Sequence, residues 1–133
     1  MNATSRRQTL TLTTLTALFI PLLVSQIAVA DSREDQLRAG LAAMERQHYA
    51  TAMRAWSDLA AAGDPEAQHN IGYMYEEGLG VTQQYDIAME WYRRAASGGL
   101  AEADHNLGMM YVDGRGAARS WAQGLIHFRK AAE

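Results

Sequence analysis

Apolar residues recur at helical spacing from residue 31 to the end of the chain, with polar residues between them. Leu37, Leu41 and Met44 begin this series, and an i, i+3/i+4, i+7 spacing of apolar positions is typical of amphipathic helices. Glycine, aspartate and proline separate the helical stretches, as expected of helix ends and starts. The pattern predicts an all-α fold of three antiparallel helix pairs. The expected helices are two within 31–62, joined by a turn at Gln47 and His48, then 65–77, 84–97, 100–113 and a last helix capped by Ser120.

One stretch of the chain occurs twice. Residues 67–80 return as residues 103–116 at a constant offset of 36, with Ala, His, Asn, Gly, Tyr, Gly and Gly in the same places. The offset continues through the second helices, where Arg93 returns as Arg129 and Ala95 as Ala131. A fixed period of 20 to 50 residues indicates stacked structural repeats. We therefore divide the chain into units 31–64, 65–99 and 100–133, the last of them degenerate.

Each predicted pair has a glycine inside its first helix. A glycine there destabilises a helix by about 1 kcal/mol relative to alanine, so its repetition favours a packing role. Without a Cβ atom, the first helix lets a ring of the second helix come close. The expected glycine–ring pairs are Gly40 with Trp56, Gly72 with Tyr92, and Gly108 with Phe128. The glycine-to-alanine spacing also predicts a tight turn in the first pair and loops four residues longer in the other two.

The pattern A-x-x-x-[LI]-G-x-x-Y-x-x-G-x-G-V, continued by A-x-x-W-Y-x-x-A-A-x-x-G, resembles the Sel-one-like repeat, a relative of the tetratricopeptide repeat. The second copy, residues 103–132, keeps the first half of this pattern, and the hairpin of residues 31–62 looks more like an ordinary tetratricopeptide unit. The resemblance implies a right-handed α/α superhelix, a solenoid that holds proteins together rather than catalysing a reaction. The matching residues are Ala67, Ile71, Gly72, Tyr75, Gly78, Gly80, Val81, Ala88, Trp91, Tyr92, Ala95, Ala96 and Gly99.

The first 30 residues have the layout of a secretory signal peptide. Arg6 and Arg7 precede an uncharged stretch from residue 8 to residue 30, and Ala28-Val29-Ala30 forms a cleavage signature. We expect cleavage between Ala30 and Asp31 and a periplasmic or secreted protein. Two alternatives stay open: an uncleaved anchor, giving a membrane-anchored scaffold, and export by the twin-arginine rather than the general route.

Charge and composition narrow the function classes. The formal net charge is −3 and becomes more negative when Arg6 and Arg7 are removed, so no basic surface for nucleic acid or anionic lipid is expected. The chain has no cysteine, which excludes a thiolate nucleophile and a Cys-ligated metal. Some exported relatives with cysteine pairs in each repeat are credited with antibiotic-binding or hydrolysing activity, so a hydrolase-type enzyme is the alternative function, disfavoured here by the missing cysteines.

No other motif points to a cofactor, a metal or catalysis. His69 and His105 share a repeat position, but they form no H-E-x-x-H or equivalent ligand set. The glycines at residues 78 and 80 do not follow a strand and lack the lysine of a phosphate-binding loop, so we interpret them as helix-end and loop residues. We expect no catalytic residues, no cofactor and no metal.

The first helices of tetratricopeptide-like pairs line the concave face of the stack, so their outward positions are the candidate partner-binding site. This surface would be an acidic groove with an apolar and aromatic floor, suited to a peptide or helix with basic and apolar residues. A solvated face without a partner is the alternative. The candidate residues are Glu34, Leu37, Leu41, Met44, Glu66, His69, Tyr73, Glu76, Glu77, His105, Met109 and Asp113.

Most rings and methionines, Trp121 among them, have the spacing of core residues. Leu125 and its neighbours on the last helix would leave an apolar surface open, because no further helix follows in this sequence. We therefore expect this end to pack on a partner, on a second copy of the chain, or on further sequence.

Overall fold

The structure, a computed structural model, describes residues 32–133. The predicted signal peptide, residues 1–30, lies outside the described residues. The chain divides into two compact units, Met1–Glu34 and Asp35–Glu133, and the following paragraphs concern the second.

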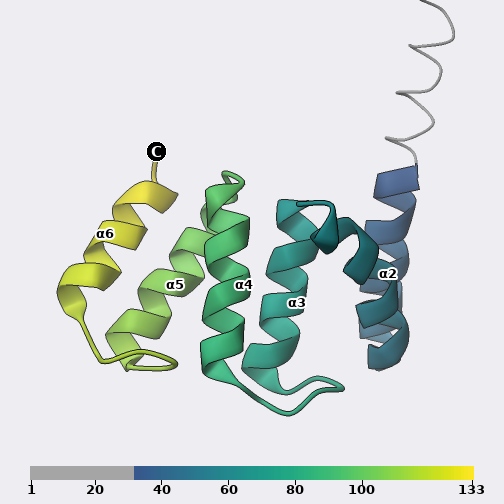
Figure 1. The fold of residues 1–133 in the computed structure, drawn as a ribbon, viewed down its shortest axis with the longest axis horizontal. Coiled ribbons are helices and arrows are strands. Elements are labelled where there is room, and N and C mark those ends of the chain that lie inside the picture. The colour runs from purple at the N-terminus through teal and green to yellow at the C-terminus, as the bar shows by residue number, and fades with distance from the viewer. Residues whose placement is uncertain (1–31) are drawn as a thin grey trace, which may run out of the picture. The chain divides into compact units, whose positions relative to one another are not determined.

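Helices and short loops make up the second unit (Figure 1). The first described helix covers residues 32–45, and residues 35–45 of it belong to this unit. The described residues contain no strand, and the all-α prediction is confirmed. The remaining helices are α2 (Tyr49–Ala61), α3 (Pro65–Glu77), α4 (Tyr85–Ser97), α5 (Ala101–Asp113) and α6 (Trp121–Ala131).

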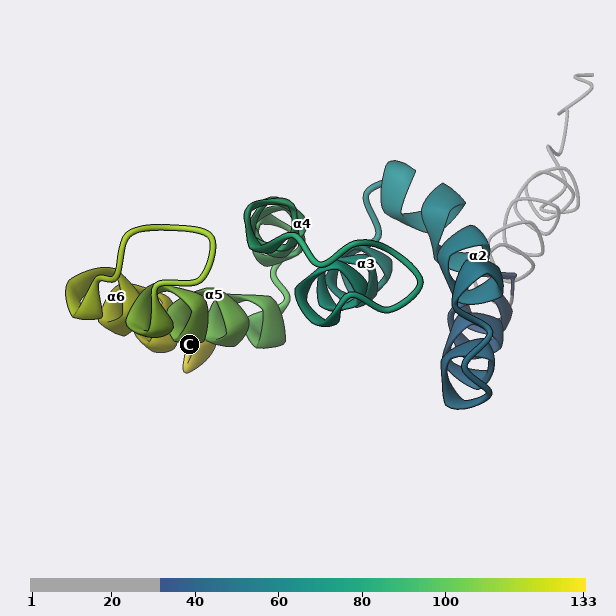
Figure 2. The ribbon, with the colours of Figure 1, turned by 90° about the horizontal axis from the view of Figure 1, so that it is seen from below.

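Neighbouring helices pack on one another in chain order. The second helix α2 contacts α3, α3 contacts α4, α4 contacts α5, and α5 contacts α6. The loop 114–120, which joins α5 to α6, is wide in the view of Figure 2, and 78–84 joins α3 to α4 in the same way. Only residues 46–48 join the helix of residues 32–45 to α2, so the predicted difference in loop length is confirmed.

Capping residues explain where α3 and α6 begin and where α3 ends. The Asp64 side chain accepts a hydrogen bond from the Ala67 backbone N–H at 2.9 Å, and Pro65 occupies the first turn of α3. Ser120 caps α6 in the same way. Gly78 ends α3 with φ 68°, a left-handed conformation that glycine adopts without steric cost.

The glycine–ring pairs are confirmed in all three units. A Cβ atom added at Gly72 would lie 2.9 Å from the ring of Tyr92, and one at Gly108 would lie 2.5 Å from the ring of Phe128. At Gly40 the added atom would collide with the Trp56 indole. Real side chains do not approach this closely, so these helix pairs need glycine at all three places.

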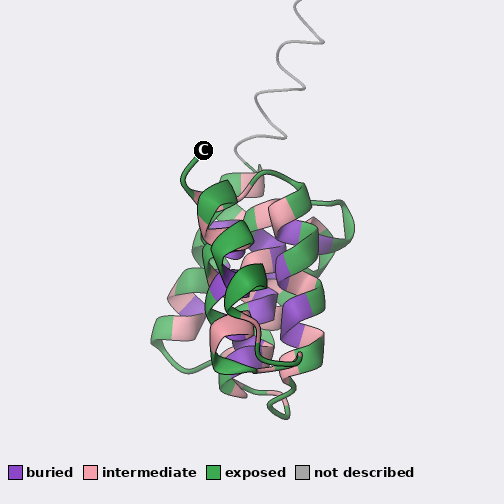
Figure 3. Ribbon diagram, turned by 90° about the vertical axis from the view of Figure 1, so that its left-hand side faces the viewer, coloured by how far each residue is buried: buried purple, intermediate pink, exposed green. Residues whose placement is uncertain are grey.

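The core of the unit consists of two clusters. The first joins the helix of residues 32–45, α2 and α3, with Trp56 at 1% exposure among its largest side chains, and the second joins α4 and α5 around Tyr92. Figure 3, seen from the α6 side, shows buried residues between the helices and exposed residues over the outermost helix. The prediction that Trp121 belongs to the core was wrong, because it lies on α6 and is 60% exposed.

Candidate functional site

Two adjoining hollows form one groove along the first helices of the helix pairs. The larger, about 430 Å³, lies between the helix of residues 32–45 and α3, and the smaller, about 330 Å³, continues to the start of α5. Because Leu41, His69 and Asn70 line both hollows, we treat them as one surface, the first-helix groove. The other lining residues are Met44, Glu45, Trp56 and Tyr73 in the larger hollow and Glu66, Leu100 and Glu102 in the smaller.

The floor of the first-helix groove is apolar and its edges are acidic. Leu41 is 51% exposed and Tyr73 is 44% exposed, so large apolar side chains stand open to solvent. Carboxylates come from Glu45, Glu66 and Glu102, and the lining residues include no lysine or arginine. An exposed apolar patch bordered by charges of one sign is typical of a protein-binding surface.

The packing of α3 explains why two of its side chains line this groove. Gly72 faces the Tyr92 ring of α4, and His69, three residues earlier on the same side of α3, also approaches that ring. His69 and Tyr73 are four residues apart and therefore share one side of the helix. The glycine that sets the helix pairing thus also directs the tyrosine next to it into the groove.

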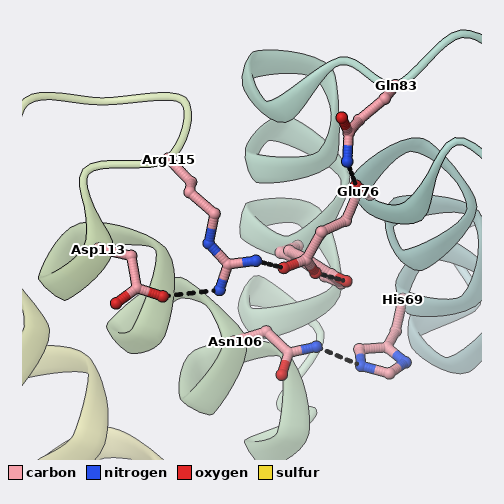
Figure 4. Close-up of polar contacts among 7 residues, drawn as sticks. His69, Glu76, Gln83, Asn106, Asp113 and Arg115 are labelled. Atoms are coloured by element: carbon pink, nitrogen blue, oxygen red, sulfur yellow. Dashed lines mark hydrogen bonds and ion pairs between the residues drawn. The ribbon is translucent and has the colours of Figure 1, made fainter.

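His69 links the two repeats at the base of the groove. Its Nε2 accepts a hydrogen bond from the side-chain amide of Asn106 on α5 at 3.0 Å (Figure 4), and its ring lies 5.3 Å from the ring of Tyr92. Burial lowers the pKa of His69 below 6.5, although a hydrogen bond with Asn70 and the charges of nearby glutamates oppose the shift. The imidazole is therefore neutral at pH 7, as an acceptor for Asn106 requires.

The prediction that Glu76 is exposed in the groove was wrong. Glu76 is buried and accepts hydrogen bonds from the Tyr92 hydroxyl and from Arg115, both at 2.6 Å. Arg115 also pairs with Asp113 at 2.9 Å, as Figure 4 shows. Burial raises the pKa of the Tyr92 hydroxyl far above its ordinary value, so this group is a donor. Glu76 joins α3 to α4 and to the loop after α5, which makes it a structural residue.

Leu37 also proved to be a core residue rather than part of the groove. It is 7% exposed and belongs to the first core cluster. The Trp56 indole N–H donates to the Leu37 carbonyl oxygen at 3.3 Å. The ring that packs on Gly40 therefore also covers the turn before it.

The remaining predicted residues are exposed but do not line either hollow. Glu77, His105, Met109 and Asp113 are exposed, and Asp113 is engaged by Arg115. Glu34 is exposed and belongs to the unit of residues 1–34. Sequence reasoning missed Asn70, Leu100 and the Trp56 edge as lining residues. The recurrence of Asn70 as Asn106 was an available signal, since Asn106 holds His69.

Within residues 32–133, no group of three or more histidine or acidic side chains lies close enough to hold a metal ion. In the same part of the chain, the helices lack the length and apolar character that a bilayer crossing requires.

Comparison with protein families decides the classification. The family model of the Sel1 repeat matches residues 65–100 and 101–133, the two units in which the 36-residue offset was found. The chain belongs to the Sel1 repeat family. The comparison with curated proteins gave no match.

Solved Sel1 structures resemble the chain over most of its length. A Sel1 repeat protein from Oxalobacter formigenes has 38% sequence identity and a TM-score of 0.67 over 70% of this chain. The antigen c5321 of uropathogenic Escherichia coli, described as displaying an SLR fold, has 31% identity and a TM-score of 0.69 over 75% of this chain. The matches span 38% and 22% of these two proteins, so the chain corresponds to part of the length of each. Its fold is an α/α solenoid of the Sel1 type.

Proposed function

We propose that this Sel1 repeat chain is a non-enzymatic interaction module that binds a partner protein through the first-helix groove. The bound segment is a peptide or helix that presents apolar side chains to Leu41 and Tyr73 and basic side chains to the glutamates at the edges. Sel1 repeats generally serve as interaction scaffolds, which supports this class of function.

The observation that carries the proposal is the groove itself. Leu41 and Tyr73 expose about half of their surface in one continuous hollow, although burying them would stabilise the fold by about 1.5–3 kcal/mol each. A helix or extended peptide that covers them gains this free energy on binding. The carboxylates at the edges favour basic partners and repel acidic ones.

The sequence of residues 1–30 supports export of this module. Its basic start, uncharged stretch and Ala-x-Ala site are the features read by the secretion machinery. We propose a periplasmic or secreted location, with the mature chain starting at Asp31. Sequencing the N-terminus of the protein recovered from the periplasm tests this directly, and an intact leader would instead favour a membrane-anchored scaffold.

The α6 face is a second contact surface in this proposal. Trp121, Leu125 and Ile126 are 60%, 52% and 45% exposed. Such a cluster favours association with a second copy of the chain or with another partner. Gel filtration over a range of concentrations tests it, and a monomer that binds no apolar dye at any concentration contradicts it.

Selection of peptides from a random displayed library tests the groove even while the natural partner is unidentified. We expect the enriched peptides to combine apolar with lysine or arginine residues. Tyr73→Ala and Leu41→Ala should weaken their binding by roughly tenfold or more, as expected for central interface residues. Met109→Ala is the matched control, because it removes an exposed apolar side chain that lines neither hollow of the groove. Enrichment of acidic peptides, or equal losses in all three variants, would contradict the proposal.

A further inference from the structure

A separate hollow of about 330 Å³ lies between α4, α5 and α6. On α5 it is lined by Asp104 and Leu107, which helical spacing places on the side opposite His105 and Met109. This hollow, called the α6 hollow below, is therefore distinct from the first-helix groove. Its other lining residues are Arg93, Ala96 and Ser97 on α4 and His127 and Lys130 on α6.

An Asp–His pair forms one wall of the α6 hollow. The Asp104 carboxylate lies 2.8 Å from His127 Nδ1, and both side chains are nearly buried, at 13% and 15% exposure. Because a carboxylate only accepts, Nδ1 carries the proton and Nε2 is the ring nitrogen left for a ligand. Tyr111 stacks on the imidazole at 5.5 Å with an angle of 11° between the rings, which fixes its orientation.

Comparison of the two repeats shows that this pair is specific to the second one. At an offset of 36, Asp104 corresponds to Gln68 and His127 to Trp91. Gln68 donates to the Ala60 carbonyl oxygen at 3.0 Å, and the Trp91 indole packs against the first core cluster. The first repeat thus has an amide and a large apolar ring where the second has a carboxylate, an imidazole and a hollow. Burying ionisable groups in place of an amide and an apolar ring is unfavourable for folding, which points to a role in binding.

The cations around the α6 hollow indicate the chemistry of its ligand. Arg93 and Lys130 approach it from α4 and α6, and Arg93 is positioned by a hydrogen bond to the Tyr111 hydroxyl at 3.3 Å. On α2, the second helix of the preceding pair, Ser57 stands 36 residues before Arg93, so α2 offers no cation at the equivalent place. We propose that the α6 hollow binds a small oxyanion, a carboxylate or a phosphate, held by Arg93 and Lys130 beside the His127 ring. Guanidinium and ammonium groups are strong donors to such anions.

The α6 hollow binds rather than hydrolyses. Ser97 also lines it, but its hydroxyl donates to the Arg93 carbonyl oxygen of its own helix at 2.9 Å. Among the described residues, the contact that His127 makes through its ring nitrogens is the one with Asp104. A nucleophile hydrogen-bonded to a base is the signature of a hydrolase of this kind, and His127 holds none.

Titration of the full chain with inorganic phosphate and, separately, with succinate tests the proposal. The NMR signals of the His127 ring should shift and saturate at millimolar anion, at constant ionic strength. The anion with the lower dissociation constant identifies the source of the oxyanion. Lys130→Ala should weaken binding by about tenfold, because a charge-assisted hydrogen bond is lost.

Two further variants make the outcome decisive. Arg129→Ala removes the same charge from the neighbouring position, which does not line the α6 hollow, and should leave binding unchanged. The double variant Asp104→Gln/His127→Trp introduces the residues of the first repeat. It should abolish anion binding, as measured by calorimetry, while the chain stays folded. The proposal would be overturned if neither anion gave a saturable shift, or if Lys130→Ala and Arg129→Ala weakened binding equally.

Discussion

At the scale of single residues, the glycines inside the first helices determine how closely each helix pair packs. Gly72 illustrates the balance between local and tertiary preference. Alanine would favour the helix by about 1 kcal/mol, but its Cβ atom would lie 2.9 Å from the Tyr92 ring. The ring cannot move freely, because its hydroxyl donates to the buried Glu76. Packing therefore outweighs helix propensity at this position.

Gly72→Ala should therefore destabilise the chain by about 1–2 kcal/mol, the cost of overpacking less the gain in helix propensity. Urea unfolding followed by circular dichroism measures this. In the background of Tyr92→Leu, which removes the ring, the same change should cost much less, so a double-mutant cycle isolates the contact. A stabilising Gly72→Ala would show that the ring does not require the glycine.

Glu76 and Glu77 are adjacent in sequence and opposite in role. Glu76 accepts from Tyr92 and Arg115 in a buried site, whereas Glu77 is exposed. Glu76→Gln should destabilise the chain by roughly 2–3 kcal/mol, because Arg115 loses a charged acceptor in a partly buried place. Glu77→Gln should stay within about 0.5 kcal/mol of the parent chain. Thermal unfolding of both variants checks the difference, and equal effects would mean that the buried network adds nothing.

His69 gives the stability of the chain a dependence on pH. Its pKa is 6.5 in the unfolded chain and lower in the folded one, so the unfolded chain binds more protons between the two values. The free energy of unfolding should fall as the pH is lowered from 6.5 to the folded pKa and level off below it. Unfolding in urea between about pH 5 and pH 7, above the range in which carboxylates titrate, measures this change.

His69→Asn should remove this part of the pH dependence, and His48→Asn is the control, since His48 is exposed. If both variants keep the pH dependence of the parent chain, the pKa of His69 does not differ between the folded and the unfolded chain, which contradicts this prediction.

At the scale of helices, the element boundaries could be predicted because local sequence determines them. Asp64 with Pro65, Ser120, and the glycines at the helix ends mark starts and stops through contacts within a few residues. The glycine–ring pairs could be predicted too, because the repeat shows which second-helix position faces each glycine. The surface positions could be predicted only in part.

Leu37 and Glu76 show why the groove was only partly predictable. Both have the helical spacing of outward residues, yet both are covered by side chains from elsewhere in the chain. Trp56 covers Leu37 from 19 residues away, and Arg115 reaches Glu76 from 39 residues away. A charged residue is usually exposed, so the burial of Glu76 could be predicted only with knowledge of its distant partner Arg115.

Equivalent positions of the two repeats differ in burial, and this difference predicts how much a substitution at each should cost. Met89 on α4 is fully buried, while Leu125, its counterpart on α6, is 52% exposed. Met89→Gln should destabilise the chain by about 2–5 kcal/mol, because it buries an amide in place of an apolar side chain. Leu125→Gln should change stability by less than about 0.5 kcal/mol. Denaturant unfolding compares them, and a large loss for Leu125→Gln in a monomeric sample would show that α6 is covered by its own chain.

At the scale of the whole molecule, contacts between repeats turn separate helix pairs into one binding surface. Asn106 of the second repeat holds His69 of the first, and Arg115 holds Glu76. The first link holds a residue of the groove itself, because His69 lines both of its hollows. Each repeat thus supplies part of the groove and also fixes the part supplied by its neighbour, as expected in solenoids whose units contact their neighbours.

The most direct measurement is an NMR map of a selected apolar and basic peptide bound to the full chain. Binding through the first-helix groove predicts that the signals of Leu41, Met44, His69 and Tyr73 change most and that their changes saturate together. Signals of Trp121 and Leu125 on α6 should stay in place. Changes centred on α6 or on the α6 hollow, with the signals of the groove unaltered, would contradict the proposed function.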